Sequence, residues 1–220
     1  MSERGKTSLD IEPTEKGARS AERLKERFSL PELPAGLGAL AGSEPGIGDV
    51  YMNLNRQLAE GKLEERQKLL VATAVASATG SAGGTELFAQ AAINAGAAKQ
   101  EVLDAVSVAT VCGIFNGYYR FRHQVSEEMR AEFENFRAPF NANSFMKTTL
   151  QAPDVEAICI AVSSVNGCEL CVDGHIRKGK SLGLTTEQID ELIKVAAASS
   201  AAARAASALA GAPAPATATG

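Results

Sequence analysis

Apolar residues recur along this chain at intervals close to 3.6 residues, which is the period of an α-helix. In the segment 50–59, for example, Val50, Leu54 and Leu58 fall on one face. The same spacing predicts further helices over residues 63–78, 85–95, 100–115, 127–136, 153–165, 168–182 and 187–210. Strong β-formers are sparse, and alanine, the best helix former, is abundant throughout. The sequence therefore predicts an all-α protein.

Turn and cap residues mark several of these helix ends. Gly183 fits the position just after a helix, where a left-handed backbone is common. Thr185, with Gln188 three residues later, has the spacing of a capping box. The Asn-Gly pair at 166–167 indicates a turn directly before the helix that opens at Cys168.

The two ends of the chain and one internal segment lack this periodicity. Residues 1–20 are predicted to be a flexible tail, followed by a short charged helix over 21–28. Residues 30–48 are rich in glycine and proline, which predicts an irregular connector. The segment 211–220 is rich in Pro, Ala and Thr and is expected to be disordered. We therefore expect one domain over residues 21–210.

A weak internal repeat emerges when the sequence is shifted by 87 residues without a gap. Matches between alanines carry little weight in so alanine-rich a chain. Two matched glycine pairs at helix ends carry more, because they match turns: Gly80 with Gly167, and Gly96 with Gly183. The sequence predicts a three-helix unit used twice, over about residues 63–115 and 150–205.

The composition narrows the class of protein. The chain has 220 residues, 45% of them hydrophobic, and a net charge of −4, which disfavours a nucleic-acid or anionic-lipid partner. The first 28 residues are too charged for a secretory signal, and the stretch 195–214 carries Arg204 and is a poor membrane span. We therefore expect a cytoplasmic protein, in which cysteines are more often catalytic or metal-binding than disulfide-bonded.

Candidate chemistry is concentrated in the segment 166–175. Cys168, Cys171 and His175 stand at positions i, i+3 and i+7 and share one helix face. Both sulfurs fall in the first turn, where unpaired backbone N–H groups and the helix dipole stabilise a thiolate. His175 is four residues after Cys171 and can act as its base, directly or through a water molecule. The pattern indicates a redox-active dithiol with its own base.

Glu156 is the fourth candidate, on the helix before Cys168. A helical hairpin would return its carboxylate to His175, where it would orient the imidazole and raise its basicity. A glutamate in a first helical turn equally needs no function. The repeat assigns this chemistry to the second copy, because the matching positions of the first copy hold Leu69, Ser81, Gly84 and Phe88.

Two alternatives to a redox pair stay open on the residues alone. A closed zinc site would need four ligands, and the other candidates, Cys112, Cys159 and His123, show no ligand spacing. Cysteines can also be inert core residues. Cys112 and Cys159 lie in apolar helical runs and are expected in the core, with a raised thiol pKa. His123 receives no catalytic role.

Most polar aromatic residues of the chain gather in the segment 115–123. Such a cluster could line a pocket or an oligomer interface. A helix break with tyrosines packed at its rim is the favoured interpretation.

The four candidate residues together resemble a known family. The motif Glu-x11-Cys-x2-Cys-x3-His, preceded by an Asn-Gly pair, is similar to that of the alkylhydroperoxidase AhpD family, part of the carboxymuconolactone decarboxylase-like superfamily. The likeness covers roughly residues 50–210, and Asn116–Arg120 is similar to a second family segment. Some members have a histidine inside the CxxC, where this chain has Leu170. The resemblance implies an all-helical, internally repeated fold in a homotrimer or larger homo-oligomer.

The resemblance also implies roles and partners. Cys171 would be the attacking thiolate, Cys168 its resolving partner in a Cys168–Cys171 disulfide, and His175 with Glu156 the proton relay. No cofactor would be tightly bound. Lipoyl groups of 2-oxoacid dehydrogenase components would supply electrons as dihydrolipoamide, and the peroxiredoxin AhpC could receive them. The implied function is thiol-dependent reduction of hydroperoxides.

Three other functions stay open. The dithiol could serve a redox adaptor, a disulfide reductase with little peroxidase activity of its own. A non-redox decarboxylase or isomerase of the same superfamily is a second alternative, although such enzymes do not use a CxxC pair. A zinc-binding structural module is the third.

Overall fold

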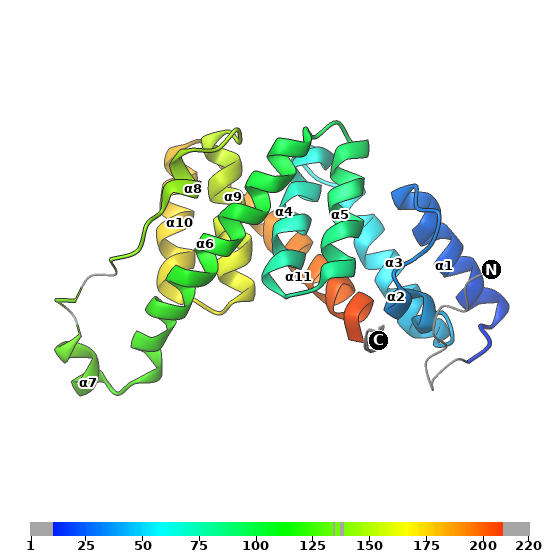
Figure 1. The fold of residues 1–220 in the computed structure, drawn as a ribbon, viewed down its shortest axis with the longest axis horizontal. Helices are drawn as coiled ribbons and strands as arrows, with labels where there is room; N and C mark the ends of the chain where they lie inside the picture. Colours follow the sequence, from blue (N-terminus) through cyan, green and yellow to red (C-terminus); the bar gives the residue numbers. More distant parts are fainter. Residues whose placement is uncertain (1–10, 134, 137–138, 209–220) are drawn as a thin grey trace, which may run out of the picture.

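The computed structural model describes residues 11–133, 135–136 and 139–208. Over these residues the chain forms eleven helices and no strand (Figure 1). The helices are α1 Glu15–Phe28, α2 Ala35–Leu40, α3 Glu44–Ala59, α4 Glu65–Ala78, α5 Ala82–Asn94, α6 Lys99–Gln124, α7 Glu127–Glu132, α8 Asn143–Met146, α9 Ala152–Val165, α10 Glu169–Ser181 and α11 Thr186–Ala208. The prediction of an all-α fold is confirmed.

The internal repeat is visible in the helix boundaries. α4, α5 and α6 begin at residues 65, 82 and 99, and α9, α10 and α11 begin at the positions that a shift of 87 predicts, 152, 169 and 186. All four glycines of the two matched pairs have positive φ, from 69° to 100°, a conformation that favours glycine at a helix end. The prediction of a three-helix unit used twice is confirmed.

The first helix of each unit forms the centre of the core. α4 is buried from Lys68 to Ala76, and α9 is buried from Val155 to Ser163 except at Glu156. These two helices lie side by side, and α6 and α11 both pack across the pair (Figure 1). The two copies meet at equivalent positions, where Gln67 Nε2 donates to Asp154 Oδ1 at 2.5 Å.

The N-terminal segment is more helical than expected. α1 begins at Glu15, six residues before the predicted start, and Thr14 Oγ1 caps it by accepting a hydrogen bond from the N–H of Gly17. The prediction of a flexible tail is therefore wrong for residues 15–20. Residues 1–10 and the segment 211–220, expected to be disordered, lie outside the described part of the chain.

The glycine- and proline-rich segment 30–48 is also largely helical, so the irregular connector expected there is wrong. α2 lies within it, and α3 begins at Glu44. Gly36 packs so closely on α11 that a Cβ there would lie 2.1 Å from the carbonyl oxygen of Ala205. This glycine allows two helices to approach each other, and α2 continues through it.

α6 is longer than the pattern indicated, because it runs to Gln124 instead of ending near Phe115. The helix break favoured for residues 115–123 is therefore wrong. By length and hydropathy, α6 is the one described helix that could cross a membrane. Core helices of soluble proteins pass the same test, and α6 packs against α4 and α9. α11, which covers most of the stretch 195–214, does not meet these criteria of length and hydropathy.

Candidate active site

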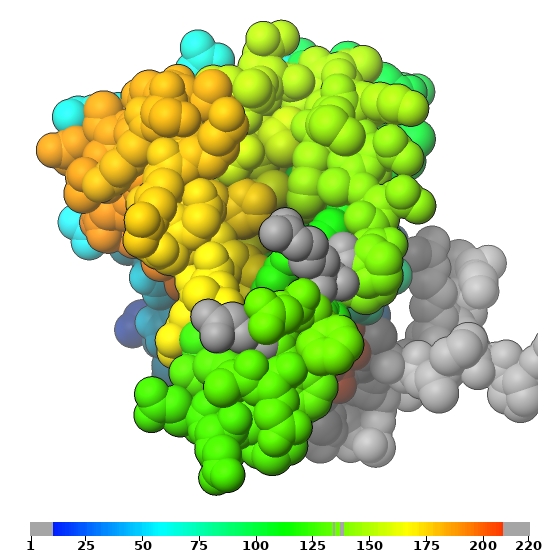
Figure 2. Space-filling view, turned by 90° about the vertical axis from the view of Figure 1, so that its left-hand side faces the viewer, coloured from blue at the N-terminus to red at the C-terminus, as the bar shows by residue number. Residues whose placement is uncertain are grey.

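A cavity of about 520 Å³ lies at one end of the molecule. Figure 2 views this end, with α10 in yellow beside α6 and α7 in green. The lining residues come from four helices: Cys112, Phe115, Asn116 and Tyr119 of α6, Phe145 of α8, Glu156 of α9, and Leu170, Cys171, Gly174, His175 and Lys178 of α10. Three of the four candidate residues, Glu156, Cys171 and His175, therefore share one cavity wall.

The turn at 166–167 sets the start of α10. Gly167 has a φ of 69°, and the N–H of Cys168 donates to the carbonyl of Ser163, which closes the end of α9. Cys168 is the N-cap of α10 and Cys171 lies in its first turn. Their sulfurs are joined in a disulfide, with the two Cα atoms 5.3 Å apart. When reduced, both sulfurs stand at the positive end of the helix dipole, which stabilises a thiolate.

The two cysteines of this pair differ in their access to the cavity. Cys168 is fully buried, whereas Cys171 is 9% exposed and lines the cavity. A molecule that enters the cavity therefore meets Cys171 first.

His175 and Glu156 meet across the hairpin of α9 and α10. The imidazole Nδ1 lies 2.8 Å from Oε2 of Glu156, and both side chains are largely buried. Because a carboxylate only accepts hydrogen bonds, Nδ1–H is the donor, and Nε2 of the neutral ring carries no proton. The ring of Phe145 packs edge-on against the imidazole at 6.2 Å between centroids. The expected return of Glu156 to His175 is confirmed by this hydrogen bond.

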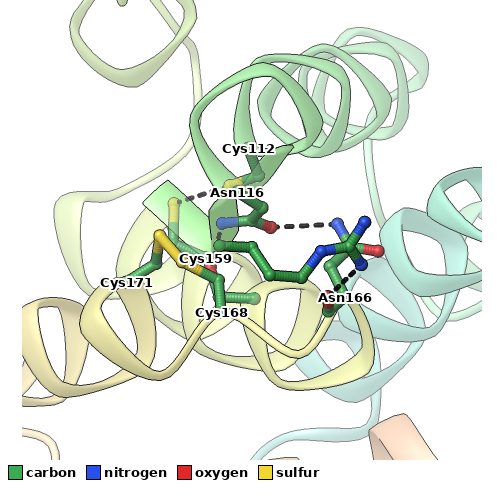
Figure 3. The surroundings of a disulfide bond; sticks show 8 residues. Cys112, Asn116, Cys159, Asn166, Cys168 and Cys171 are labelled. Atoms are coloured by element: carbon green, nitrogen blue, oxygen red, sulfur yellow. Dashed lines mark hydrogen bonds between the residues drawn. A yellow bond between two sulfur atoms is a disulfide. The ribbon is translucent and has the colours of Figure 1, made fainter. Parts of the chain in front are cut away.

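A chain of hydrogen bonds ties α6 to the turn before α10 (Figure 3). Asn116 Nδ2 donates to Ser163 Oγ at 3.0 Å, and Asn116 Oδ1 accepts from Asn166 Nδ2 at 2.9 Å. Arg120 donates to the carbonyl oxygen of Asn166 at 2.9 Å. Asn116 is only 2% exposed. Its amide therefore fixes the turn from which α10 starts, a role that the sequence did not reveal because its partners are about fifty residues away.

The two remaining cysteines are buried, and their sulfurs lie 3.4 Å apart. The neighbouring Cys112 thiol and burial raise the pKa of Cys159 well above its ordinary value. The prediction that Cys112 and Cys159 lie in the core is confirmed. Cys112 also lines the cavity, which its apolar sequence context did not indicate.

The aromatic cluster at 115–123 supplies one wall of the cavity. Phe115 and Tyr119, one turn apart on α6, stack at 6.3 Å between centroids and both line it. Phe145 of α8 packs on Phe115 at 6.0 Å. Of the interpretations considered for this segment, the pocket is right. His123 is exposed near the end of α6 and is not among the lining residues.

Three further lining residues were missed in the sequence. Gly174 and Lys178 follow Cys171 at i+3 and i+7, so the helical spacing that grouped the cysteines with the histidine could have found them. Phe145 lies in a four-residue helix with no periodic signal. Within the described ranges, no group of three or more His, Cys, Asp and Glu side chains is arranged to hold a metal ion.

Comparison with known proteins places these features in a family. The model of the carboxymuconolactone decarboxylase family matches residues 45–118 and 131–213. The alkyl hydroperoxide reductase AhpD of Anaeromyxobacter dehalogenans (strain 2CP-1 / ATCC BAA-258) is 35% identical over 151 residues, covering 68% of this chain and 78% of that protein. The AhpD of Coxiella burnetii (strain Dugway 5J108-111) is 31% identical over 153 residues, covering 68% and 84%. The chain belongs to the AhpD family.

A solved structure agrees with this placement at the level of the fold. It is a crystal structure described as that of a candidate gamma-carboxymuconolactone decarboxylase subunit from Burkholderia xenovorans LB400, with a TM-score of 0.63. The match covers 87% of this chain and 96% of that chain at 15% identity, so the likeness shows the fold alone. In the match to the carboxymuconolactone decarboxylase family model, all four candidate residues fall in the second matched region, whereas α1 and α2 precede the first.

Proposed function

We propose that this protein reduces organic hydroperoxides through a cysteine dithiol that cycles with its disulfide. The observation that carries the proposal is the Cys168–Cys171 pair at the start of α10, beside a cavity wall that holds the hydrogen-bonded His175–Glu156 pair. A dithiol supplies the two electrons that cleavage of a peroxide bond requires. The relatives named alkyl hydroperoxide reductase support the same activity.

Cys171 is the nucleophile in this proposal, because it lines the cavity and Cys168 does not. The Cys171 thiolate attacks the distal oxygen of the hydroperoxide, and the O–O bond breaks. The organic part departs as the alcohol, and Cys171 is now a sulfenic acid. The Cys168 thiol then attacks that sulfur, water leaves, and the disulfide closes. The Cα–Cα distance of 5.3 Å is within the range of disulfides, so this step requires little backbone movement.

His175 and Glu156 supply the base. With Nδ1–H held by the Glu156 carboxylate, Nε2 takes the thiol proton of Cys171, directly or through one water molecule. The imidazolium that forms is stabilised by the negative charge of Glu156, and it can return the proton to the leaving alkoxide. The relay therefore raises the thiolate fraction of Cys171 without an external base.

The cavity favours hydroperoxides that carry an apolar organic group. Its apolar lining is formed by Phe115, Tyr119, Phe145 and Leu170. Burial of apolar substrate surface there is worth roughly 25 cal/mol per Å², a gain that hydrogen peroxide cannot make. We therefore expect a higher kcat/KM for cumene hydroperoxide than for hydrogen peroxide.

A lipoyl dithiol completes the cycle in this proposal, on the ground of the family resemblance. A dihydrolipoamide thiolate attacks the more exposed sulfur, that of Cys171, and its second thiol releases Cys171 and Cys168 as thiols. Two electrons pass to the protein and the lipoyl group becomes a disulfide. An AhpC-type peroxiredoxin as electron acceptor and a homo-oligomeric assembly belong to the proposal on the same ground.

Counting thiols tests the cycle. One equivalent of cumene hydroperoxide should remove the thiols of Cys168 and Cys171 from the reduced protein, and dihydrolipoamide should restore both. In a Cys168→Ser variant, oxidation should stop at a sulfenic acid on Cys171, trapped with dimedone and located by mass spectrometry. The matched Cys171→Ser variant should show no sulfenic acid on Cys168. Sulfenic acid found only at Cys112 or Cys159 in the first variant would refute the assignment.

A redox adaptor is the second candidate, and one observation favours it. Leu170, between the two cysteines, is 48% exposed and offers a protein partner an apolar contact beside the disulfide. Peroxide consumption with dihydrolipoamide alone separates the two functions. Sustained turnover supports the peroxidase, and turnover that requires an added peroxiredoxin supports the adaptor. A non-redox decarboxylation would survive the double substitution Cys168→Ser/Cys171→Ser, which abolishes either redox function.

A further inference from the structure

A second pair of cysteines lies beside the proposed active site. Cys112 on α6 and Cys159 on α9 are both free thiols, with their sulfurs 3.4 Å apart (Figure 3). A disulfide has an S–S distance of about 2.05 Å, so the two sulfurs need to approach by only about 1.3 Å. Cys112 also lines the cavity that contains Cys171. A reactive molecule bound in this cavity therefore has access to both cysteine pairs.

The repeat indicates that packing does not require thiols at these positions. Under the shift of 87 residues, Cys112 of the first copy corresponds to Ser199 on α11, and Cys159 of the second copy corresponds to Ala72 on α4. Ser199 and Ala72 are both fully buried. The corresponding contact, between α4 and α11, is thus built without sulfur. The thiols occur at the contact between α6 and α9, where Cys112 also lines the cavity that contains His175.

We propose that Cys112 and Cys159 are a second oxidisable dithiol, which a hydroperoxide in the cavity converts to a Cys112–Cys159 disulfide after Cys168 and Cys171 have been oxidised. The inference rests on the proposed function in that it takes the same hydroperoxide as its oxidant. It extends that function, because each chain would then reduce two peroxide molecules before it needs a reductant.

The chemistry has two balanced steps. Cys112 Sγ attacks the distal oxygen of the hydroperoxide, the O–O bond breaks, and the alcohol leaves with the thiol proton, so that Cys112 becomes a sulfenic acid. The Cys159 sulfur then attacks the Cys112 sulfur, the S–O bond breaks, and hydroxide leaves with the Cys159 proton as water. The two thiols lose two electrons in total and one peroxide gains them.

The surroundings of the pair set this order. Cys112 lines the cavity, whereas Cys159 is fully buried on α9. The pKa of Cys159 is raised by the Cys112 thiol, by burial and by the negative charge of Glu156, one turn earlier on α9. Cys159 therefore stays protonated and acts second. Because Cys112 is 1% exposed and Cys171 is 9% exposed, Cys171 reacts first and the second pair stays reduced until more peroxide arrives.

The test uses the full chain with the first pair removed, Cys168→Ser/Cys171→Ser. After excess cumene hydroperoxide, denaturing quench and digestion, both thiols should be lost. The peptides that carry Cys112 and Cys159 should be cross-linked, with a mass lower by two hydrogens, and dihydrolipoamide should separate them. The matched control Cys112→Ser/Cys159→Ala introduces the residues found at the equivalent positions, Ser199 and Ala72, and should lose only the thiols of Cys168 and Cys171. The wild-type chain should lose two thiols with the first equivalent of peroxide and two more with the second.

Three results would overturn the inference. The first is persistence of both thiols in the double serine variant, with its helical circular dichroism intact, together with wild-type chain that loses only two thiols. The second is sulfinic acid on Cys112 without a cross-link. The third is loss of four thiols in wild type and none in the double variant, which would mean exchange with the Cys168–Cys171 disulfide instead of direct oxidation. Failure of the proposed function can be told apart from failure of this inference, because in that case Cys168 and Cys171 of the wild-type chain would stay reduced.

Discussion

Gly174 offers a direct test of whether the cavity receives the substrate. It lies in the interior of α10, three residues after Cys171, and lines the cavity. A Cβ at this position would meet no atom within 4 Å, so the missing side chain leaves open space. Glycine in a helix interior is about 1 kcal/mol less favourable than alanine. The residue therefore lowers the stability of α10 and widens the cavity next to the reactive sulfur.

Two substitutions separate these effects. Gly174→Ala should raise the free energy of unfolding by about 1 kcal/mol, which corresponds to about 3 °C in Tm for a chain of this size. Gly174→Leu places a branched side chain in the space that a bulky substrate needs. The resulting misfit should cost roughly 1–3 kcal/mol, a fall of about 5- to 150-fold in kcat/KM for cumene hydroperoxide. Hydrogen peroxide is small enough to react at a nearly unchanged rate.

The assay is steady-state peroxide consumption with dihydrolipoamide, combined with thermal unfolding. Gly113 provides the matched control, because it lies in the interior of α6, a Cβ there also meets no atom within 4 Å, and it does not line the cavity. Gly113→Leu should leave the ratio of the two kcat/KM values unchanged. Equal losses for both peroxides in Gly174→Leu, or the same selective loss in Gly113→Leu, would refute the reasoning.

Three further outcomes follow from single contacts. Glu156→Gln removes the carboxylate that holds the imidazole and should slow oxidation of the reactive cysteine by about 100-fold in stopped-flow kinetics; an unchanged rate would exclude the relay. Glu191→Gln leaves the ammonium of Lys68, whose side chain is 1% exposed, without its carboxylate partner. The free energy of unfolding measured in urea should fall by about 3–5 kcal/mol. As a control, Lys194→Met removes an exposed ion pair and should change the free energy of unfolding by less than about 1 kcal/mol. Because the pKa of Cys159 is raised, its thiolate fraction in the reduced native chain should be lower than that of an ordinary cysteine at pH 8 and should increase at higher pH. Alkylation of Cys159 should be correspondingly slow until the chain is unfolded, and fast labelling in the native state would contradict this assignment.

The helical core could be predicted from sequence because its signals are local. Helix periodicity and the positive-φ glycines are properties of a few neighbouring residues, and they located the repeat to the residue. The prediction of an irregular connector over residues 30–48 was wrong because the contact that matters there is not local. Glycine-rich composition alone predicts a loop, but Gly36 is in a helix, and the close approach of a carbonyl of α11, about 170 residues away, leaves no room there for a side chain.

The candidate site divides in the same way. Cys168, Cys171 and His175 belong to one helix, so their spacing alone groups them. Placing Glu156 next to His175 required the prediction that the two helices form a hairpin, and the hydrogen bond between the two side chains confirms that placement. The rest of the cavity wall comes from α6 and α8, and a residue such as Phe145 joins it only through the tertiary fold.

The position of the first copy that corresponds to Cys171 is closely packed. Gly84 occupies the position that Cys171 has in the second copy, and a Cβ on Gly84 would lie 2.7 Å from Ala203 of α11. Ala203 in turn is the equivalent of Asn116 on α6. α5 and α11 are therefore in close contact at Gly84 and Ala203, whereas the corresponding contact between α10 and α6 has Cys171, Asn116 and an open cavity.

An edge-on aromatic contact occurs at the position of His175 and at the equivalent position of the first copy. In the first copy Phe88 takes this place, fully buried, and Phe28 of α1 packs edge-on against it at 5.8 Å. In the second copy Phe145 packs edge-on against His175 at 6.2 Å, and the ring that it holds is an imidazole next to a carboxylate. α1 lies before the matched family region and its Phe28 packs on a fully buried Phe88, whereas α8 borders a cavity of about 520 Å³ that Cys171 lines. Close packing at small residues such as Gly84 therefore leaves little room at the equivalent position of the first copy, and exchanging the ionisable side chains alone would not create an equivalent cavity there.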